Sequence, residues 1–390
     1  MKKILAKEHI LFLMIFGLSL ITSAFLIRII YPIHLQEQKP VFFDLIELNA
    51  IFPLWLIYFF GSINIFFIWI IAKKFFLGRL ALIPVLIYCF SPWSFYLMVA
   101  ESFYVYLLTL LLITFLGILQ VKSEKSKLGI LLFVLGSILA LYSSLLLLMI
   151  YPILIGGLVW IKFIPYKKIS LSLFIVALFC LPLLISLFRN QVGIKNIYRN
   201  QITLFADPGH INIINAFQGE SSQAGFNFLS KIAENKYVYF SKYILLKAFK
   251  QITPSTYFTS QEGLLKFSFS PPIYFGFIIP FFYGLYLILD AISLRKYLVA
   301  SFILLIPSFV SKELVNLNRL VLFEPVVILI ISLGIVKIAQ RKKERIFKFV
   351  LFLTIILVSI QFLVTIFDIN LREYARYERH FGGSLQIGEQ

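Results

Sequence analysis

The chain has 390 residues, of which 60% are hydrophobic and only 14% are charged, and its mean hydropathy is +0.93. Soluble domains average roughly 45–50% apolar and roughly 25% charged residues, so this composition excludes a soluble enzyme and favours a multi-pass membrane protein. The scarcity of glycine, proline and charge also excludes collagen-like, coiled-coil and disordered chains. The formal charge of +18 therefore has to be interpreted relative to a bilayer.

Continuous apolar runs, rather than alternating ones, predict an all-α polytopic membrane protein. We expect about 11 transmembrane helices, because one span needs about 20 mostly apolar residues. The predicted spans are residues 10–30, 51–72, 80–98, 103–119, 128–141, 145–161, 169–188, 273–292, 298–310, 320–336 and 347–367. A turn at Tyr-Ser-Ser (142–144) separates the fifth span from the sixth.

The basic residues predict the orientation of these spans. Twenty of the 36 basic side chains fall in the segments that are cytoplasmic if the N-terminus is inside. The short outer loops carry only Lys39, Lys312 and Arg319. By the positive-inside rule, we expect a cell (inner) membrane protein with a cytoplasmic N-terminus and an extracytoplasmic C-terminus. The charge excess then indicates contact with anionic membrane lipids and no nucleic-acid partner.

The sequence predicts one transmembrane domain over residues 1–367. Within it lies a large extracytoplasmic loop at 189–271, and a short extracytoplasmic tail follows at 368–390. The loop contains Asp-Pro-Gly at 207–209, which signals a turn, and amphipathic stretches at 226–235 and 237–250. Because long loops in compact proteins are usually functional, we expect substrate contacts here and include Asp207 among the candidates.

The remaining motif content is sparse. Cys89 and Cys180 lie in apolar spans and are predicted to be small buried hydrophobes with no disulfide framework. The four histidines are scattered without the paired spacing of a metal site. No cofactor or metal ligand is assigned, and a divalent metal is left open. No glycine-rich nucleotide loop is present, so ATP hydrolysis is not expected.

Charged residues at the predicted outer surface are candidates for function, because charge near lipid is costly. Asp44 and Glu47 lie in the first outer loop, where a carboxylate is either a general base toward a hydroxyl or an ordinary solvated charge. Glu101 belongs to the second outer turn, after Ser-Pro-Trp at 91–93, and either contacts substrate or stabilises a helix dipole. Trp93 fits a substrate contact or an interfacial aromatic belt.

Two arginines can likewise be interpreted either as functional residues or as interfacial anchors. Arg319 stands immediately before an apolar span, where it either binds a lipid phosphate through its planar guanidinium or snorkels to the interface. Arg28, near the outer end of the first span, either snorkels or pairs with a carboxylate. Glu324 lies five residues beyond Arg319, deeper in the span, and requires a partner.

Several short motifs occur in an order that resembles a known family. They are Lys-Lys-Phe-Phe (73–76), Ser-Pro-Trp (91–93), Ala-Glu-Ser (100–102), Leu-Phe-Ala-Asp-Pro-Gly (204–209), Gln-Gly-Glu (218–220), Asn318-Arg319 with Pro325 and Gly334, and the tyrosines at 374 and 377. This order resembles the lipid-linked-sugar glycosyltransferases of the GT-C fold, and more narrowly the bacterial relatives of protein O-mannosyltransferases and aminoarabinose transferases. The resemblance covers roughly residues 60–380.

The resemblance implies an inverting glycosyltransferase that moves a sugar from a polyprenyl phosphate to a lipid, glycan or protein acceptor hydroxyl on the outer face. Asp44 is the best match for the catalytic base and Glu47 the second. The family usually has an acidic pair in a longer loop, whereas Asp44 has no adjacent acid. Arg319, Glu101, Arg28, Trp93 and Asp207 are the implied substrate-binding residues. The shorter loop keeps two alternatives open, a non-catalytic binding or scaffold protein for lipid-linked glycans and a lipid-linked glycan polymerase or ligase.

Overall fold

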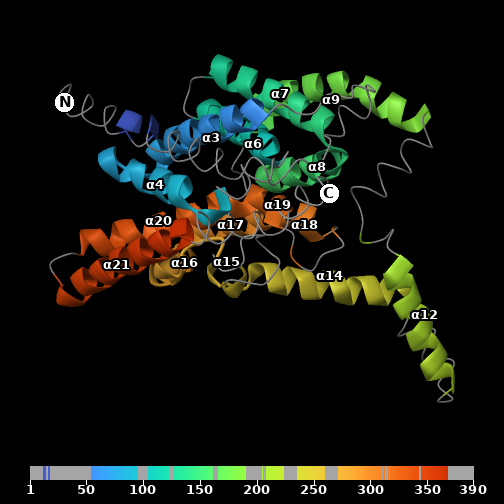
Figure 1. Cartoon of the computed structure of the whole chain (residues 1–390). Coiled ribbons are helices and arrows are strands. Elements are labelled where there is room, and N and C mark those ends of the chain that lie inside the picture. Colours follow the sequence, from blue (N-terminus) through green and yellow to red (C-terminus); the bar gives the residue numbers. More distant parts are fainter. Residues whose placement is uncertain are drawn as a thin grey trace, which may run out of the picture.

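The structure is a computed structural model that carries no ligand. It describes residues 12–14, 16–17, 54–94, 104–122, 126–160, 166–189, 204, 208–223, 235–259, 271–309, 311, 315, 317–341 and 344–367. All secondary structure in these residues is helical, as the sequence predicts, with fifteen α-helices and four short 3₁₀-helices (Figure 1).

The first half of the chain forms a run of apolar helices. They are α3 (Leu54–Phe75), η2 (Gly78–Ala81), α4 (Leu82–Phe90), α6 (Tyr104–Lys122), α7 (Ser126–Ser143), α8 (Leu145–Trp160) and α9 (Tyr166–Arg189). The last turn of α3 contains Lys73 and Lys74, cations that suit the negative end of a helix dipole. Helices α7 and α8 are separated at Ser144, which confirms the predicted break between them.

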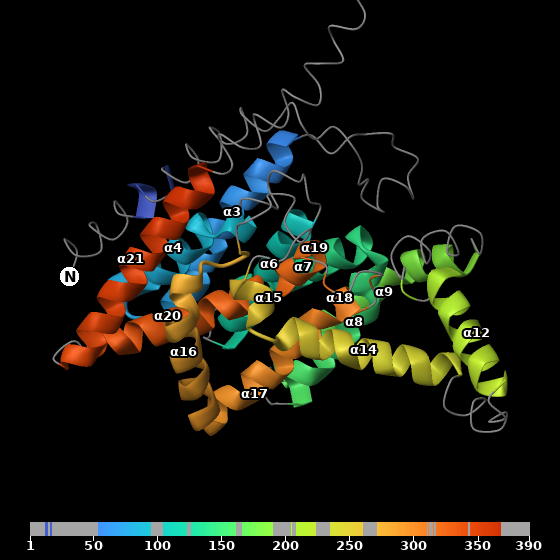
Figure 2. The same cartoon turned by 60° about the horizontal axis from the view of Figure 1, so that its bottom comes forward.

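The second half alternates long helices with short ones. They are α12 (Pro208–Gln223), α14 (Lys236–Ile252), α15 (Ser255–Phe258), η3 (Phe275–Phe277), α16 (Ile278–Asp290), α17 (Ile292–Ser301), η4 (Phe302–Leu305), α18 (Ile306–Phe309), α19 (Leu317–Leu320), η5 (Val321–Phe323), α20 (Glu324–Gln340) and α21 (Arg345–Phe367). In both views α12 lies at the N-terminal end of α14 (Figures 1 and 2).

Two expectations for the large loop can be compared with the structure. The predicted amphipathic stretch at 237–250 is confirmed as α14, whose N-cap Asn235 accepts a hydrogen bond from Val238 N at 2.9 Å. The predicted turn at 207–209 is wrong for its described part, because Pro208 and Gly209 begin α12. A proline suits the first helical turn, since its φ is already helical and its missing N–H would have had no intrahelical acceptor.

Fewer helices are long and apolar enough to span a membrane than the sequence predicts. In the described part of the chain, three segments are long and apolar enough to cross a membrane: Tyr104–Val121, Leu317–Gln340 and Arg345–Thr365. A fourth is obtained if Phe275–Asp290 and Leu294–Phe309, bent by 116° relative to each other, form one span. Helices occupy each of the ten predicted spans after the first, but several are too short or too broken to cross unaided.

Close helix packing depends on glycine. A Cβ atom added to Gly334 of α20 would lie 1.9 Å from the carbonyl oxygen of Pro280 in α16. One added to Gly284 of α16 would lie 2.0 Å from the carbonyl oxygen of Ile330. Gly117 plays the same part between α6 and α7. Small residues let membrane helices approach closely enough for extensive van der Waals contact, so these glycines set the spacing of α16 against α20 and of α6 against α7.

Candidate functional site

The candidate site is formed where three distant segments meet: residues 91–94 after α4, residues 271–273 before η3, and the α19–α20 region. The Ser91 hydroxyl donates to the carbonyl oxygen of Pro272 at 3.0 Å, and Trp93 N donates to the same oxygen at 3.0 Å. Ile273 N in turn donates to the carbonyl oxygen of Tyr257 at 2.8 Å. The Ser-Pro-Trp segment is therefore held to the end of the large loop by the Ser91 hydroxyl and the Trp93 backbone N–H.

Trp93 lies at the centre of this junction. Its side chain is fully buried, and its indole Nε1–H donates to the carbonyl oxygen of Leu317 at 3.2 Å. The ring packs against Tyr257, with 5.9 Å between ring centroids, and Tyr257 packs against Phe323 at 6.4 Å. Because Trp93 is fully buried, it does not belong to a lipid-facing aromatic belt. Its contacts connect the Ser-Pro-Trp segment to the residues around Arg319.

Tyr257 completes the apolar wall and carries one polar contact. Burial raises the pKa of its phenol, so the hydroxyl stays protonated. It donates to the carbonyl oxygen of Gln251 at 2.6 Å. This bond links α15 to the end of α14 beside the junction.

Glu324 is the first residue of α20 and is completely buried. The hydroxyl of Ser94 donates to its Oε1 at 2.9 Å, across 230 positions of sequence. Among the residues that the structure describes, its Oε2 has no hydrogen-bond partner. A carboxylate at a helix N-terminus is favoured by the dipole, yet a buried polar atom without a partner is costly, which is typical of a functional position.

Arg319 lies five residues before Glu324 and is also buried, with 7% of its surface exposed. Its Nη1 donates to the carbonyl oxygen of Pro307 in α18 at 3.3 Å. This position excludes a snorkelling side chain that extends into the aqueous interface. The guanidinium lies inside the protein, where a low dielectric strengthens its attraction for an anion.

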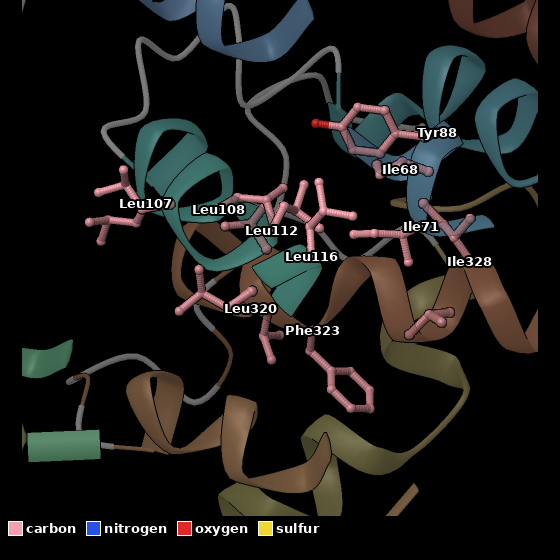
Figure 3. Close-up of a cluster of buried hydrophobic side chains, with 14 of the residues drawn as sticks. Ile68, Ile71, Tyr88, Leu107, Leu108, Leu112, Leu116, Leu320, Phe323 and Ile328 are labelled. Carbon is pink, nitrogen blue, oxygen red and sulfur yellow. The ribbon is translucent and has the colours of Figure 1, made fainter. Parts of the chain in front are cut away.

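An apolar cavity of about 410 Å³ is lined by sequence neighbours of Arg319 and Glu324. Leu322 and Pro325, on either side of Glu324, contribute to its wall, as does Leu304, three residues before the Pro307 carbonyl that Arg319 contacts. Figure 3 shows other wall residues, Ile71 from α3 and Leu112 from α6, whose side chains lie between these helices and α20. A cavity of this size with an almost entirely apolar wall suits an apolar chain.

The large loop is joined to the same region by α14. The Lys247 ammonium is fully buried and donates to the carbonyl oxygens of Phe309 and Ser311. Gln251, one turn later, is also buried and donates from Nε2 to the Ser308 hydroxyl at 2.9 Å. These contacts hold α14 against the C-terminal end of α18, close to the Pro307 carbonyl that Arg319 contacts.

Lys247→Met should weaken this docking. Methionine keeps most of the aliphatic length but removes the donor to two buried carbonyl groups, so we expect a loss of about 1–3 kcal/mol of local stability. Amide hydrogen exchange of α14 should accelerate in this variant. Lys250→Met, an exposed change on the same helix, is the matched control. Equal exchange in the two variants would contradict the assigned contact.

The predicted site residues fall into two groups. The structure brings Trp93 and Arg319 into one junction, together with Glu324. Five other candidates lie outside the described residues: Arg28, Asp44, Glu47, Glu101 and Asp207.

Sequence reasoning missed three polar residues of this junction: Ser94, Gln251 and Lys247. Lys247 was detectable, because Phe240, Tyr243, Ile244, Lys247 and Gln251 share one face of a helix, and a lysine on an apolar face needs a partner. Nothing local distinguishes Ser94, whose acceptor lies 230 residues away. The predicted burial of Cys89 and Cys180 is confirmed.

No group of three or more His, Cys, Asp or Glu residues suited to a metal ion occurs within the described part of the chain. No protein-family model, curated protein or solved structure matches this chain.

Proposed function

We propose that this protein is a GT-C-type membrane glycosyltransferase that moves a sugar from a polyprenyl phosphate to an acceptor hydroxyl on the outer face. The observation that carries the proposal is the burial of Arg319 and Glu324 at one end of a candidate membrane span whose next residues line an apolar cavity. Ionisable residues inside a membrane domain are functional candidates, because their burial has to be compensated.

This arrangement suits an amphiphilic donor. A polyprenyl phosphate combines an anion with a long apolar chain. Arg319 supplies a planar, permanently charged donor group that matches the phosphate oxygens. The cavity wall begins at Leu322, one turn along the same segment, so a chain leaving the phosphate meets an apolar surface at once. The polar and apolar parts of the donor thus have neighbouring binding surfaces.

The chemistry follows from the sequence-predicted roles. A carboxylate of the first outer loop, Asp44 first and Glu47 second, accepts the proton of the acceptor hydroxyl. The hydroxyl oxygen forms a bond to the anomeric carbon as the bond from that carbon to the phosphate oxygen breaks, which inverts the configuration. The lipid phosphate leaves with both electrons of the broken bond, and Arg319 stabilises its charge. In the orientation predicted from the basic residues, with a cytoplasmic N-terminus and a first span at residues 10–30, Asp44 falls on the outer face.

The test is sugar transfer by the purified full-length protein in lipid nanodiscs, with a panel of polyprenyl-phosphate sugars. We expect single-sugar products, which Asp44→Asn, or Asp44→Asn with Glu47→Gln, abolishes. Asp290→Asn, at an exposed carboxyl, should retain activity. Arg319→Lys should weaken donor binding about tenfold, because the planar fork is lost, whereas Arg295→Lys should not.

Three outcomes would overturn the proposal. Full activity of the double carboxylate variant would exclude the assigned base. Donor binding without turnover would favour a binding or scaffold protein, and a ladder of polymer products would favour a polymerase or ligase.

A further inference from the structure

Helix α14 presents two very different faces. One face is fixed to the protein through the buried side chains of Lys247 and Gln251. The other exposes large apolar side chains: Leu245 is 61% exposed, Leu246 54% and Phe249 66%. A soluble surface rarely exposes adjacent residues of this kind, so the apolar face requires an occupant.

The charges around this face indicate what that occupant is. Lys242, Leu246 and Lys250 recur at four-residue spacing and form one exposed row beside the row of Leu245 and Phe249. Residues 236–252 include four lysines and no acidic side chain. Lysines that border an apolar helical face are typical of helices that bind anionic lipid surfaces.

The attachment of α14 brings this face close to the membrane region. Lys247 contacts the carbonyl of Phe309, the last residue of Leu294–Phe309, which forms a candidate membrane span only together with Phe275–Asp290. Figures 1 and 2 both show α14 beginning far from α16 and ending beside α15 and α18. A helix fastened to the end of a membrane segment holds its exposed face where headgroups and upper acyl chains are found.

We infer that the exposed face of α14, formed by Leu245, Leu246, Phe249, Lys242 and Lys250, binds anionic phospholipid of the outer leaflet. The apolar side chains enter the upper acyl region, and the lysine ammonium groups contact lipid phosphates. The contact anchors the large loop beside the Arg319 junction. It does not depend on sugar transfer, because it rests on a surface outside that junction.

Helix α12 provides an internal comparison. It also exposes apolar side chains, with Ile211 47% and Phe217 46% exposed. It has no lysine or arginine between Pro208 and Gln223, and it carries Glu220. If apolar exposure alone determined lipid contact, α12 and α14 would behave alike. If the lysines contribute, only α14 responds to anionic lipid.

The experiment places an environment-sensitive fluorophore on Phe249→Cys or, as control, on Phe217→Cys, in full-length protein with Cys89→Ala and Cys180→Ala. Nanodiscs contain phosphatidylcholine alone or phosphatidylcholine mixed with phosphatidylglycerol, and a spin-labelled phosphatidylglycerol quenches fluorophores in contact with it. We expect strong quenching at position 249. Each of the substitutions Lys242→Gln and Lys250→Gln should lower the affinity for phosphatidylglycerol relative to phosphatidylcholine about fivefold. Position 217 should show little quenching.

Each other outcome overturns the inference. Absence of quenching at position 249 would mean that α14 faces water or protein. Equal quenching by spin-labelled phosphatidylcholine, unchanged in the lysine variants, would mean apolar contact without anionic recognition. Thiol cross-linking between two copies of the Phe249→Cys variant would identify a second copy of the chain as the occupant. Unchanged thermal unfolding of the two glutamine variants verifies that a loss of quenching does not reflect misfolding.

Discussion

Gly334→Ala will lower the thermal stability of the detergent-solubilised protein, whereas Gly156→Ala will leave it unchanged or raise it. Both glycines lie inside helices, so alanine gains the same helix propensity, up to about 1 kcal/mol, at either position. The surroundings differ. A Cβ at Gly334 would lie 1.9 Å from the Pro280 carbonyl oxygen, while among the described residues no atom outside the surrounding helix backbone lies within 4 Å of a Cβ at Gly156.

The contact at Gly334 is with backbone, which cannot rotate away as a side chain can. Helices α16 and α20 therefore have to separate, and overpacking of this kind costs about 1–3 kcal/mol. Gly284→Ala should behave in the same way, because its Cβ would meet the Ile330 carbonyl. Combined, the two changes should cost less than the sum of their separate effects, since one separation of the helices relieves both clashes.

The difference in stability between the Gly334→Ala and Gly156→Ala variants can be measured by heating each protein and recording the loss of the monodisperse species. Equal stability of the Gly334→Ala and Gly156→Ala variants would contradict the close approach of α16 and α20. The approach matters for the site because α20 begins with Glu324, and α16 follows Pro272, which accepts hydrogen bonds from Ser91 and Trp93. Separated helices would displace both parts of the junction.

The sequence predicts helices well, because apolar runs and their punctuation are local signals. The break between α7 and α8 and the amphipathic α14 both follow from short windows of sequence. Whether a predicted helix spans the membrane is harder to predict. Residues 273–310 were expected to be two spans, but they form two helical segments bent by 116°, which together make at most one candidate span. Composition alone does not register such a bend.

The candidate site is less predictable than the helices, for a physical reason. Residue chemistry indicates that a buried Glu324 needs a partner, but only the fold brings Ser94 to it across 230 residues. The contact between Trp93 and Leu317 spans 224 residues. A single sequence contains no information about such pairings, whereas the solvation cost of a charge in an apolar span is apparent from the span itself.

Replacing Trp93 with alanine will have the largest effect of any single change in the junction. Truncating a fully buried tryptophan to alanine costs about 3–5 kcal/mol, and here it also removes the ring contact with Tyr257 and the hydrogen bond to Leu317. Trp93→Phe is the more informative variant. It keeps an aromatic ring but removes the N–H that donates to Leu317, leaving a buried carbonyl without this donor at a cost of about 1–3 kcal/mol.

The consequence for function concerns Arg319, two residues beyond Leu317. If the indole bond positions that segment, Trp93→Phe should weaken binding of the proposed polyprenyl-phosphate donor at a temperature where the variant is fully folded. Trp69→Phe is the matched control, because Trp69 is also buried but stacks on Phe12. A Trp93→Phe variant with reduced stability and unchanged donor affinity would assign Trp93 to folding alone. Reduced affinity in this variant only would link the Ser-Pro-Trp segment to Arg319 through one hydrogen bond.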